Sequence, residues 1–133
     1  MKKALGTGLA ALLAVGFMAG GAAYAQEVDL AAKTAELTAA GESVFADNCA
    51  VCHGEKGEGN VGPKLDGNDW IAERSNIINQ VLFGATDHGM PPFKDVLTDD
   101  QIAAVATYVR NSWSNSYGPV LPQSVASIRS ATK

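Results

Sequence analysis

The stretch Cys49-Ala50-Val51-Cys52-His53 carries the strongest signal in this chain. Residues three apart near the end of a helix project to the same side, so two thiols placed in this way can bond to the two vinyl groups of one porphyrin. The residue that follows, His53, then lies under the iron and can donate an imidazole nitrogen. This C-x-x-C-H spacing is the attachment signature of a c-type haem. We therefore predict one covalently attached haem c, with Cys49 and Cys52 as thioethers and His53 as an axial iron ligand.

Other uses of the cysteine pair stay open from the motif alone. A thioredoxin-like C-x-x-C would lie beside strands in a βαβ pattern, which the sequence does not show. A zinc site needs about four ligands. The chain has two cysteines and two histidines, so such a site would use Cys49, Cys52, His53 and His88 together. The adjacency of Cys52 and His53 makes that arrangement awkward, and haem attachment is the favoured interpretation.

The second axial ligand follows by elimination. The chain has three methionines, and Met1 and Met18 lie in the N-terminal segment. Met90 remains, in the loop segment Gly89–Phe93, where a glycine allows close approach and two prolines stiffen the backbone. We predict Met90 as the second iron ligand. His88 is the rival, and it would give bis-histidine ligation with a lower reduction potential.

The N-terminus has the layout of an export signal. A short basic start of two lysines precedes an almost uncharged apolar run over residues 4–20, and the small residues Ala23 and Ala25 fit a cleavage site. We predict a signal peptide over residues 1–25, cleaved after Ala25. The mature protein would then be periplasmic, with no membrane span. An uncleaved N-terminal anchor is the alternative.

Charge limits the classes of partner. The formal net charge is −4 at pH 7, and removal of the two N-terminal lysines would make the mature chain more acidic. An acidic surface argues against nucleic acid and anionic membranes as partners.

Helical periodicity predicts an all-α domain. Three segments have an apolar stripe, and Thr98 with Gln101 fits a capping box at the start of the last of them. The loops between these helices are long for a small domain, which makes sense if they wrap a cofactor. The predicted helices cover residues 37–48, 74–83 and 98–113. The predicted parts after the signal are a flexible lead-in (26–36), a haem domain (37–113) and a C-terminal extension (114–133).

The chain resembles the class I cytochrome c family in its small bacterial periplasmic form. Besides the cysteine motif, the resemblance rests on Gly62-Pro63-Lys64-Leu65, on Gly89-Met90-Pro91 and on Tyr108, and it covers roughly residues 41–113. It implies a cytochrome c-like fold with three main helices and long loops wrapped around one covalently attached haem.

The resemblance also implies roles for individual residues. The Pro63 carbonyl would accept the Nδ1 hydrogen of His53, and Gly41 and Phe45 would meet Tyr108 where the first and last helices cross. Trp70 would hydrogen-bond a haem propionate, with simple packing as its alternative. The residues implied to line the haem crevice, for which ordinary core packing is the alternative, are Leu65, Ile78, Val81, Leu82, Phe93 and Val96.

These expectations describe an electron-transfer protein and not an enzyme. With His53 and Met90 on the two faces of the iron, we expect a single-electron carrier. A periplasmic dehydrogenase would be its donor, and a terminal oxidase or reductase its acceptor. The segment 108–113 and the extension resemble cytochrome subunits of periplasmic dehydrogenases, so a dedicated subunit is one alternative. The extension could equally be a strap packed on the domain. A haem-based ligand sensor or peroxidase is a remote alternative.

Overall fold

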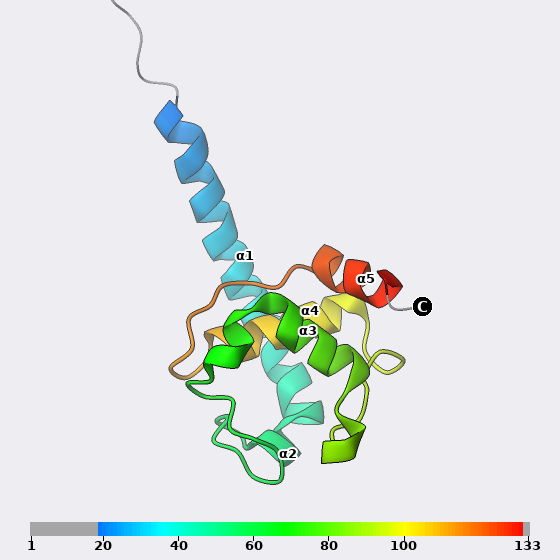
Figure 1. Ribbon diagram of the computed structural model, residues 1–133. Coiled ribbons are helices and arrows are strands. Elements are labelled where there is room, and N and C mark those ends of the chain that lie inside the picture. Colours follow the sequence, from blue (N-terminus) through cyan, green and yellow to red (C-terminus); the bar gives the residue numbers. More distant parts are fainter. Residues whose placement is uncertain (1–18, 132–133) are drawn as a thin grey trace, which may run out of the picture.

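The computed structural model describes residues 19–131, and these residues form helices and loops without a β-strand. The prediction of an all-α fold is therefore confirmed. The predicted signal peptide lies mainly outside the described residues. The elements, labelled in Figure 1, are α1 (Ala19–Asn48), α2 (Ala50–His53), the 3-10 turn η1 (Asp69–Ala72), α3 (Arg74–Phe83), the 3-10 turn η2 (Thr86–His88), α4 (Asp99–Asn111) and α5 (Pro122–Ala131).

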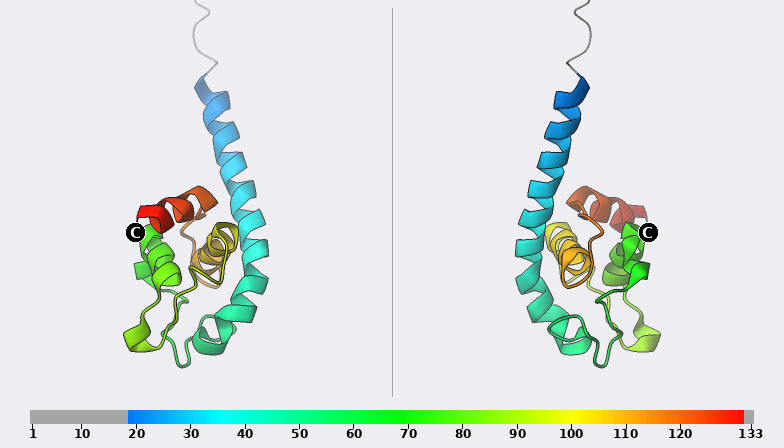
Figure 2. Two further views of the ribbon diagram at one scale, coloured as in Figure 1. Left: turned by 90° about the vertical axis from the view of Figure 1, so that its right-hand side faces the viewer. Right: turned by 90° about the vertical axis from the view of Figure 1, so that its left-hand side faces the viewer.

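Helix α4 forms the centre of the molecule. Figure 2 shows it between α1 on one side and α3 with α5 on the other. Thr98 caps it through the predicted box: its hydroxyl accepts from the Gln101 amide, while the Gln101 side chain accepts from Thr98 N. The sequence predicted one buried stripe, but α4 is enclosed on almost every side. Its buried residues are Ile102, Ala103, Ala104, Val105, Ala106, Thr107, Val109 and Arg110.

The crossing of α1 and α4 depends on Gly41. A Cβ at this position would lie 2.1 Å from the Ala104 carbonyl oxygen and 2.7 Å from Tyr108 Cβ, so only glycine allows this approach. Beside it, the rings of Phe45 and Tyr108 have centroids 5.3 Å apart, and Trp113 packs edge-on against Phe45 at 5.5 Å. The predicted meeting of Gly41 and Phe45 with Tyr108 is therefore observed. This contact fixes the direction of the helix that carries the cysteine motif.

Helix α1 begins earlier than the sequence predicted. It starts at Ala19 instead of residue 37, so the expected flexible lead-in over residues 26–36 is helical. From residue 29 onward, Leu37 is the first buried residue along it, and the preceding turns project beyond the other elements in Figure 1. Alanine-rich sequence continues the helix by propensity alone, without a packing stripe to mark its start. No helix between residues 19 and 131 is both long enough and apolar enough to cross a membrane.

The C-terminal extension packs on the domain as a strap. Val120 and Val125 are completely buried, and both belong to the single core. The Thr107 hydroxyl, on α4, donates to the Val120 carbonyl at 3.2 Å and accepts from the Val120 amide at 2.9 Å. Of the two roles weighed for this segment, the structure supports the strap.

Candidate haem site

The cysteine motif lies where α1 passes into α2. The Cys49 amide donates to the Phe45 carbonyl at 2.8 Å, and the His53 amide donates to the Cys49 carbonyl at 2.9 Å. These bonds continue a helical path through the motif, so Cys49 and Cys52 lie one turn apart. Both thiols are free and half-buried. The aromatic contacts of Phe45 thereby hold the start of the motif against α4.

The His53 imidazole is buried and held in one orientation. Its Nδ1 lies 2.8 Å from the Pro63 carbonyl oxygen, the contact that the family resemblance implies. With the Nδ1 hydrogen donated to that carbonyl, Nε2 is the nitrogen that keeps a lone pair for a metal. The loop is closed over the ring by two backbone bonds, in which Gly59 donates to the His53 carbonyl at 2.7 Å and Gly62 to the Cys52 carbonyl at 2.8 Å.

Gly62 makes the contact between the Pro63 loop and the imidazole possible. A Cβ at this position would lie 2.9 Å from His53 Cε1 and 3.0 Å from Nδ1. Real Cβ atoms essentially never come closer than that to other atoms, so a larger residue would push the ring or the loop away. The glycine of Gly62-Pro63 is therefore required by the ring of His53 and not by its own backbone angles.

The environment of Cys49 favours a neutral sulfur. Burial, with a smaller contribution from Cys52, raises the pKa of the Cys49 thiol to about 11. A thiolate metal ligand would have to be charged in this place, whereas a thioether carries no charge. Together with the oriented His53 Nε2, this donor set fits a covalently attached haem.

Met90 lies on the loop that follows η2. Its amide donates to the Ala85 carbonyl at 3.1 Å and its carbonyl accepts from the Ala85 amide at 3.0 Å, which gives an isolated antiparallel bridge. Gly84 lies against the same backbone, since a Cβ there would be 2.6 Å from the Met90 carbonyl oxygen. The sulfur accepts a hydrogen bond from Gln80 Nε2, on α3, at 3.4 Å. Met90 is half-buried, whereas its rival His88 is exposed.

The remaining predicted haem contacts divide into three groups by burial. Leu65 and Phe93 are half-buried and pack against the core. Val96 and Trp70 are 67% and 50% exposed, so neither packs in the protein core. Half of the Trp70 surface is covered, so its packing and its role toward a propionate both stay predictions. The residues that are buried in the protein core itself are Ile78, Val81 and Leu82.

The competing uses of the cysteines find no support. A thioredoxin-like site needs adjacent strands, and residues 19–131 contain none. Within the same residues, no three His, Cys, Asp or Glu side chains gather in a way that could hold a metal ion. The zinc alternative therefore has no ligand set in the described part of the chain.

Sequence reasoning missed three side chains around the site. Gln80 was not predicted to contact the Met90 sulfur, although it lies next to Val81 of the apolar face of α3 in the sequence. Arg110 lies completely buried on α4 and donates to the carbonyls of Ile71, Ala72, Tyr117 and Gly118. Arg129, on α5, reaches the loop beyond Met90. A lone cation on an enclosed helix was the available signal for Arg110, and the sequence held no comparable signal for Arg129.

Parts of the chain are similar in sequence to known proteins. The family described as cytochrome c oxidase, cbb3-type, subunit III matches residues 36–109. The chain is 41% identical to the cbb3-type cytochrome c oxidase subunit FixP of Sinorhizobium medicae, over 53% of this chain and 28% of that protein. It is 33% identical to the gluconate 2-dehydrogenase cytochrome c subunit of Pantoea cypripedii, over 67% of this chain and 24% of that protein. The matches thus cover about a quarter of these two relatives.

A solved structure agrees with the fold. Cytochrome cL of the marine methylotrophic bacterium Methylophaga aminisulfidivorans superposes with a TM-score of 0.52 at 32% identity, covering 57% of this chain and 53% of that one. The family match includes the cysteine motif, the Pro63 loop, Met90 and Tyr108. The chain therefore belongs to the class I c-type cytochromes, an electron-transfer family, with a cytochrome c domain of the cbb3 subunit III type.

Proposed function

We propose that this chain is a periplasmic single-electron carrier. One haem c would be bound covalently through Cys49 and Cys52, with His53 and Met90 as the axial iron ligands. The observation that carries the proposal is the buried imidazole of His53, whose Nδ1 is engaged by the Pro63 carbonyl at 2.8 Å. A histidine held in this way presents Nε2 in one direction and with raised basicity, as a metal ligand requires.

When bound, a c-type haem supplies one-electron exchange between ferric and ferrous iron. The side chains of this protein decide what else can happen there. His53 and Met90 would occupy both axial positions, so an external ligand could enter only by displacing one of them. A thioether ligand and an apolar surrounding raise the reduction potential. The site therefore supports electron relay better than binding or turnover of a small molecule.

The location rests on the N-terminal segment. We infer that residues 1–25 are a signal peptide, cleaved after Ala25, and that the haem domain over residues 37–113 acts in the periplasm. Export also fits covalent attachment, since it places both cysteines outside the reducing cytoplasm. An N-terminal sequence determination on the secreted protein checks the cleavage site.

The partners are proposed from the relatives. The similarity to a gluconate 2-dehydrogenase cytochrome c subunit supports a periplasmic dehydrogenase as electron donor. The similarity to an oxidase subunit supports a terminal oxidase or reductase as acceptor. A dedicated subunit of a dehydrogenase complex is the second candidate. Because residues 114–131 pack on their own domain, the extension no longer favours it, and the relatives alone do so.

The experiment that tests the proposal is a redox titration with carbon monoxide challenge. The purified holoprotein should follow a one-electron Nernst curve, and its ferrous form should not bind carbon monoxide at neutral pH. Ready carbon monoxide binding would contradict the carrier and favour the sensor or peroxidase alternative. Co-purification from the native source separates the remaining two: a carrier elutes alone, and a dedicated subunit elutes with a larger enzyme.

A further inference from the structure

We propose that Arg129 is a positioning residue for Met90: from the C-terminal helix α5, it clamps the base of the loop that carries the second iron ligand. The inference rests on the proposed function, in which Met90 binds the haem iron. The C-terminal extension would then help to hold the loop that carries Met90 at the haem site.

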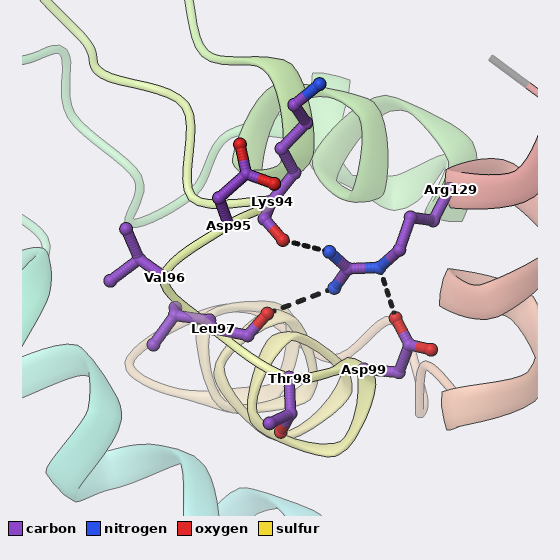
Figure 3. A pocket seen from close by; sticks show the side chains of 7 residues that line it. All are labelled: Lys94, Asp95, Val96, Leu97, Thr98, Asp99 and Arg129. Carbon is purple, nitrogen blue, oxygen red and sulfur yellow. Dashed lines mark hydrogen bonds and ion pairs between the residues drawn. The ribbon is translucent and has the colours of Figure 1, made fainter. Parts of the chain in front are cut away.

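Figure 3 shows the Arg129 guanidinium directed from α5 into the segment 94–99. It donates to the carbonyl oxygens of Lys94 and Leu97, the latter at 3.0 Å, and its Nε donates to Asp99 Oδ1 at 2.7 Å. One side chain thus ties together two carbonyls of a loop and the first residue of α4. The two carbonyls lie four and seven residues after Met90, in the same loop.

The other edge of the same loop is fixed to α3. The Phe93 amide donates to the Val81 carbonyl at 3.0 Å, and the Lys94 amide donates to the Leu82 carbonyl at 3.1 Å. Lys94 is therefore held on both sides, through its amide by α3 and through its carbonyl by Arg129. Loss of the arginine would leave Lys94 held only through its amide, by α3.

Helix α5, which carries Arg129, is packed firmly on the domain. Val125, one turn before it on α5, is completely buried in the core. The strap that leads to α5 is held by Arg110, which donates to the carbonyls of Tyr117 and Gly118. Because α5 already fixes the backbone of Arg129, the contact with the loop costs only the conformational freedom of the side chain.

The fork of donors matters more here than the ion pair. The side chains of Arg129 and Asp99 are 28% and 34% exposed, and ion pairs in such positions stabilise little. A guanidinium, in contrast, can serve three acceptors at once in a fixed plane, which the single ammonium group of lysine cannot reproduce. The clamp should therefore fail in Arg129→Lys as well as in Arg129→Gln.

The test measures how easily the Met90 position opens in the ferric holoprotein. Imidazole is added to wild type, Arg129→Gln, Arg129→Lys and the control Arg74→Gln. Arg74 is an exposed arginine on α3, so its replacement removes the same charge away from the loop. Loss of the long-wavelength absorption band of sulfur-ligated ferric haem is followed against temperature, with circular dichroism of the same samples as the measure of global unfolding.

We expect imidazole to enter about tenfold faster in Arg129→Gln than in wild type, as the loss of a charge-assisted hydrogen bond implies. Arg129→Lys should follow Arg129→Gln, and Arg74→Gln should match wild type. In both Arg129 variants the sulfur band should disappear at a lower temperature than the helical signal. A role limited to stability would move both temperatures together.

Equal imidazole rates in wild type and the Arg129 variants would overturn the clamp, as would band loss that coincides with unfolding. If Arg129→Gln does not fold, Arg129→Lys, which keeps the charge, decides alone by the same two criteria. The proposed function fails differently: the sulfur band would then be absent from the wild-type protein.

Discussion

The two sides of the haem site are built in different ways. On the His53 side, the proposed ligand lies at the end of a helix, its ring is buried, and its partner Pro63 is ten residues away in the sequence. On the Met90 side, the proposed ligand lies in a loop and is half-buried, and the proposed clamp on that loop comes from Arg129, 35 residues beyond Lys94. Nearby residues alone hold His53, whereas Met90 is held by nearby residues and, through its loop, by a distant segment.

This difference assigns different tasks to the two faces. The His53 side has several short backbone bonds that would all have to break before the imidazole moved. The Met90 side has the bridge to Ala85, the contact with Gln80, two backbone bonds from the following residues to α3, and the loop clamp. Any opening of the site should therefore begin at Met90, and substitutions on the two sides should have distinguishable effects.

The largest expected effect is on the free energy of unfolding, at the crossing of α1 and α4 that supports the His53 side. Gly41→Val places side-chain atoms where the Ala104 carbonyl lies and should lower the free energy of unfolding by about 3 kcal/mol. The exposed neighbour Ala40 gives the control, since Ala40→Val should cost roughly 0.5 kcal/mol through helix propensity alone. Urea unfolding of both variants measures this, and equal losses would contradict the crossing of α1 and α4 at Gly41.

A smaller effect is expected directly at the imidazole. Gly62→Ala would push against Cε1 and Nδ1 of His53 and weaken the bond to the Pro63 carbonyl. A less basic imidazole stabilises ferric iron less, so the reduction potential should rise, by about 40 mV for about 1 kcal/mol. Val61→Ala, at the exposed neighbour, should leave the potential unchanged. A fall in potential would contradict the role of the Pro63 bond.

The opposite sign is expected on the Met90 side. Gln80 donates a hydrogen bond to the Met90 sulfur, which draws electron density from the ligand. Gln80→Leu should therefore lower the reduction potential, by about 40 mV or less because sulfur is a weak acceptor. Asn79→Leu removes an exposed amide one residue earlier and serves as the control. Redox titration of both variants would contradict the contact if they shifted equally.

The smallest effect concerns acid stability on the loop that follows His53. Hydrogen bonds from the Ser114 hydroxyl and amide, with Lys64 nearby, lower the pKa of Asp66 from 3.8 to about 2. A lowered folded-state pKa means that Asp66 stabilises the fold above pH 3.8 and that this contribution is lost as the pH falls toward 2. Asp66→Asn should lose it at all pH values and so flatten the acid limb of the stability curve.

The control for Asp66→Asn is an aspartate three residues before Met90. Asp87 is exposed on η2, and Asp87→Asn, which leaves the Ser114 contact intact, serves as the control. Unfolding midpoints between pH 5 and pH 2 (about the range in which carboxylates titrate) measure both variants. An unchanged acid limb in Asp66→Asn would show that the Ser114 contact does not stabilise the fold.

Local patterns predicted much of the fold. Helix α3 has the bounds expected from its apolar face and the following Gly84, and the box of Thr98 and Gln101 caps α4 as expected. Both depend on residues within a few positions of each other, where side-chain direction is set by the helix itself. The contact of His53 with Pro63 was expected for another reason, because the family resemblance implied it.

Long-range contacts between side chains and carbonyls were not predictable in this way. The carbonyls that Arg110 and Arg129 engage belong to loops whose paths no periodicity describes. The start of α1 was missed for a different reason. The alanine-rich sequence before Leu37 has no apolar stripe that would mark where the helix begins. The sequence therefore offered candidates for the two iron ligands, but it did not predict the contacts that Arg129 makes with the loop after Met90.

The long-wavelength absorption band of the ferric holoprotein tests the central claim most directly. It should be present in the wild type and in His88→Ala and absent in Met90→Ala, because sulfur ligation alone produces it. A wild-type protein without the band, or a Met90→Ala protein with an unaltered haem spectrum, would contradict a relay with His53 and Met90 on the two faces of the iron.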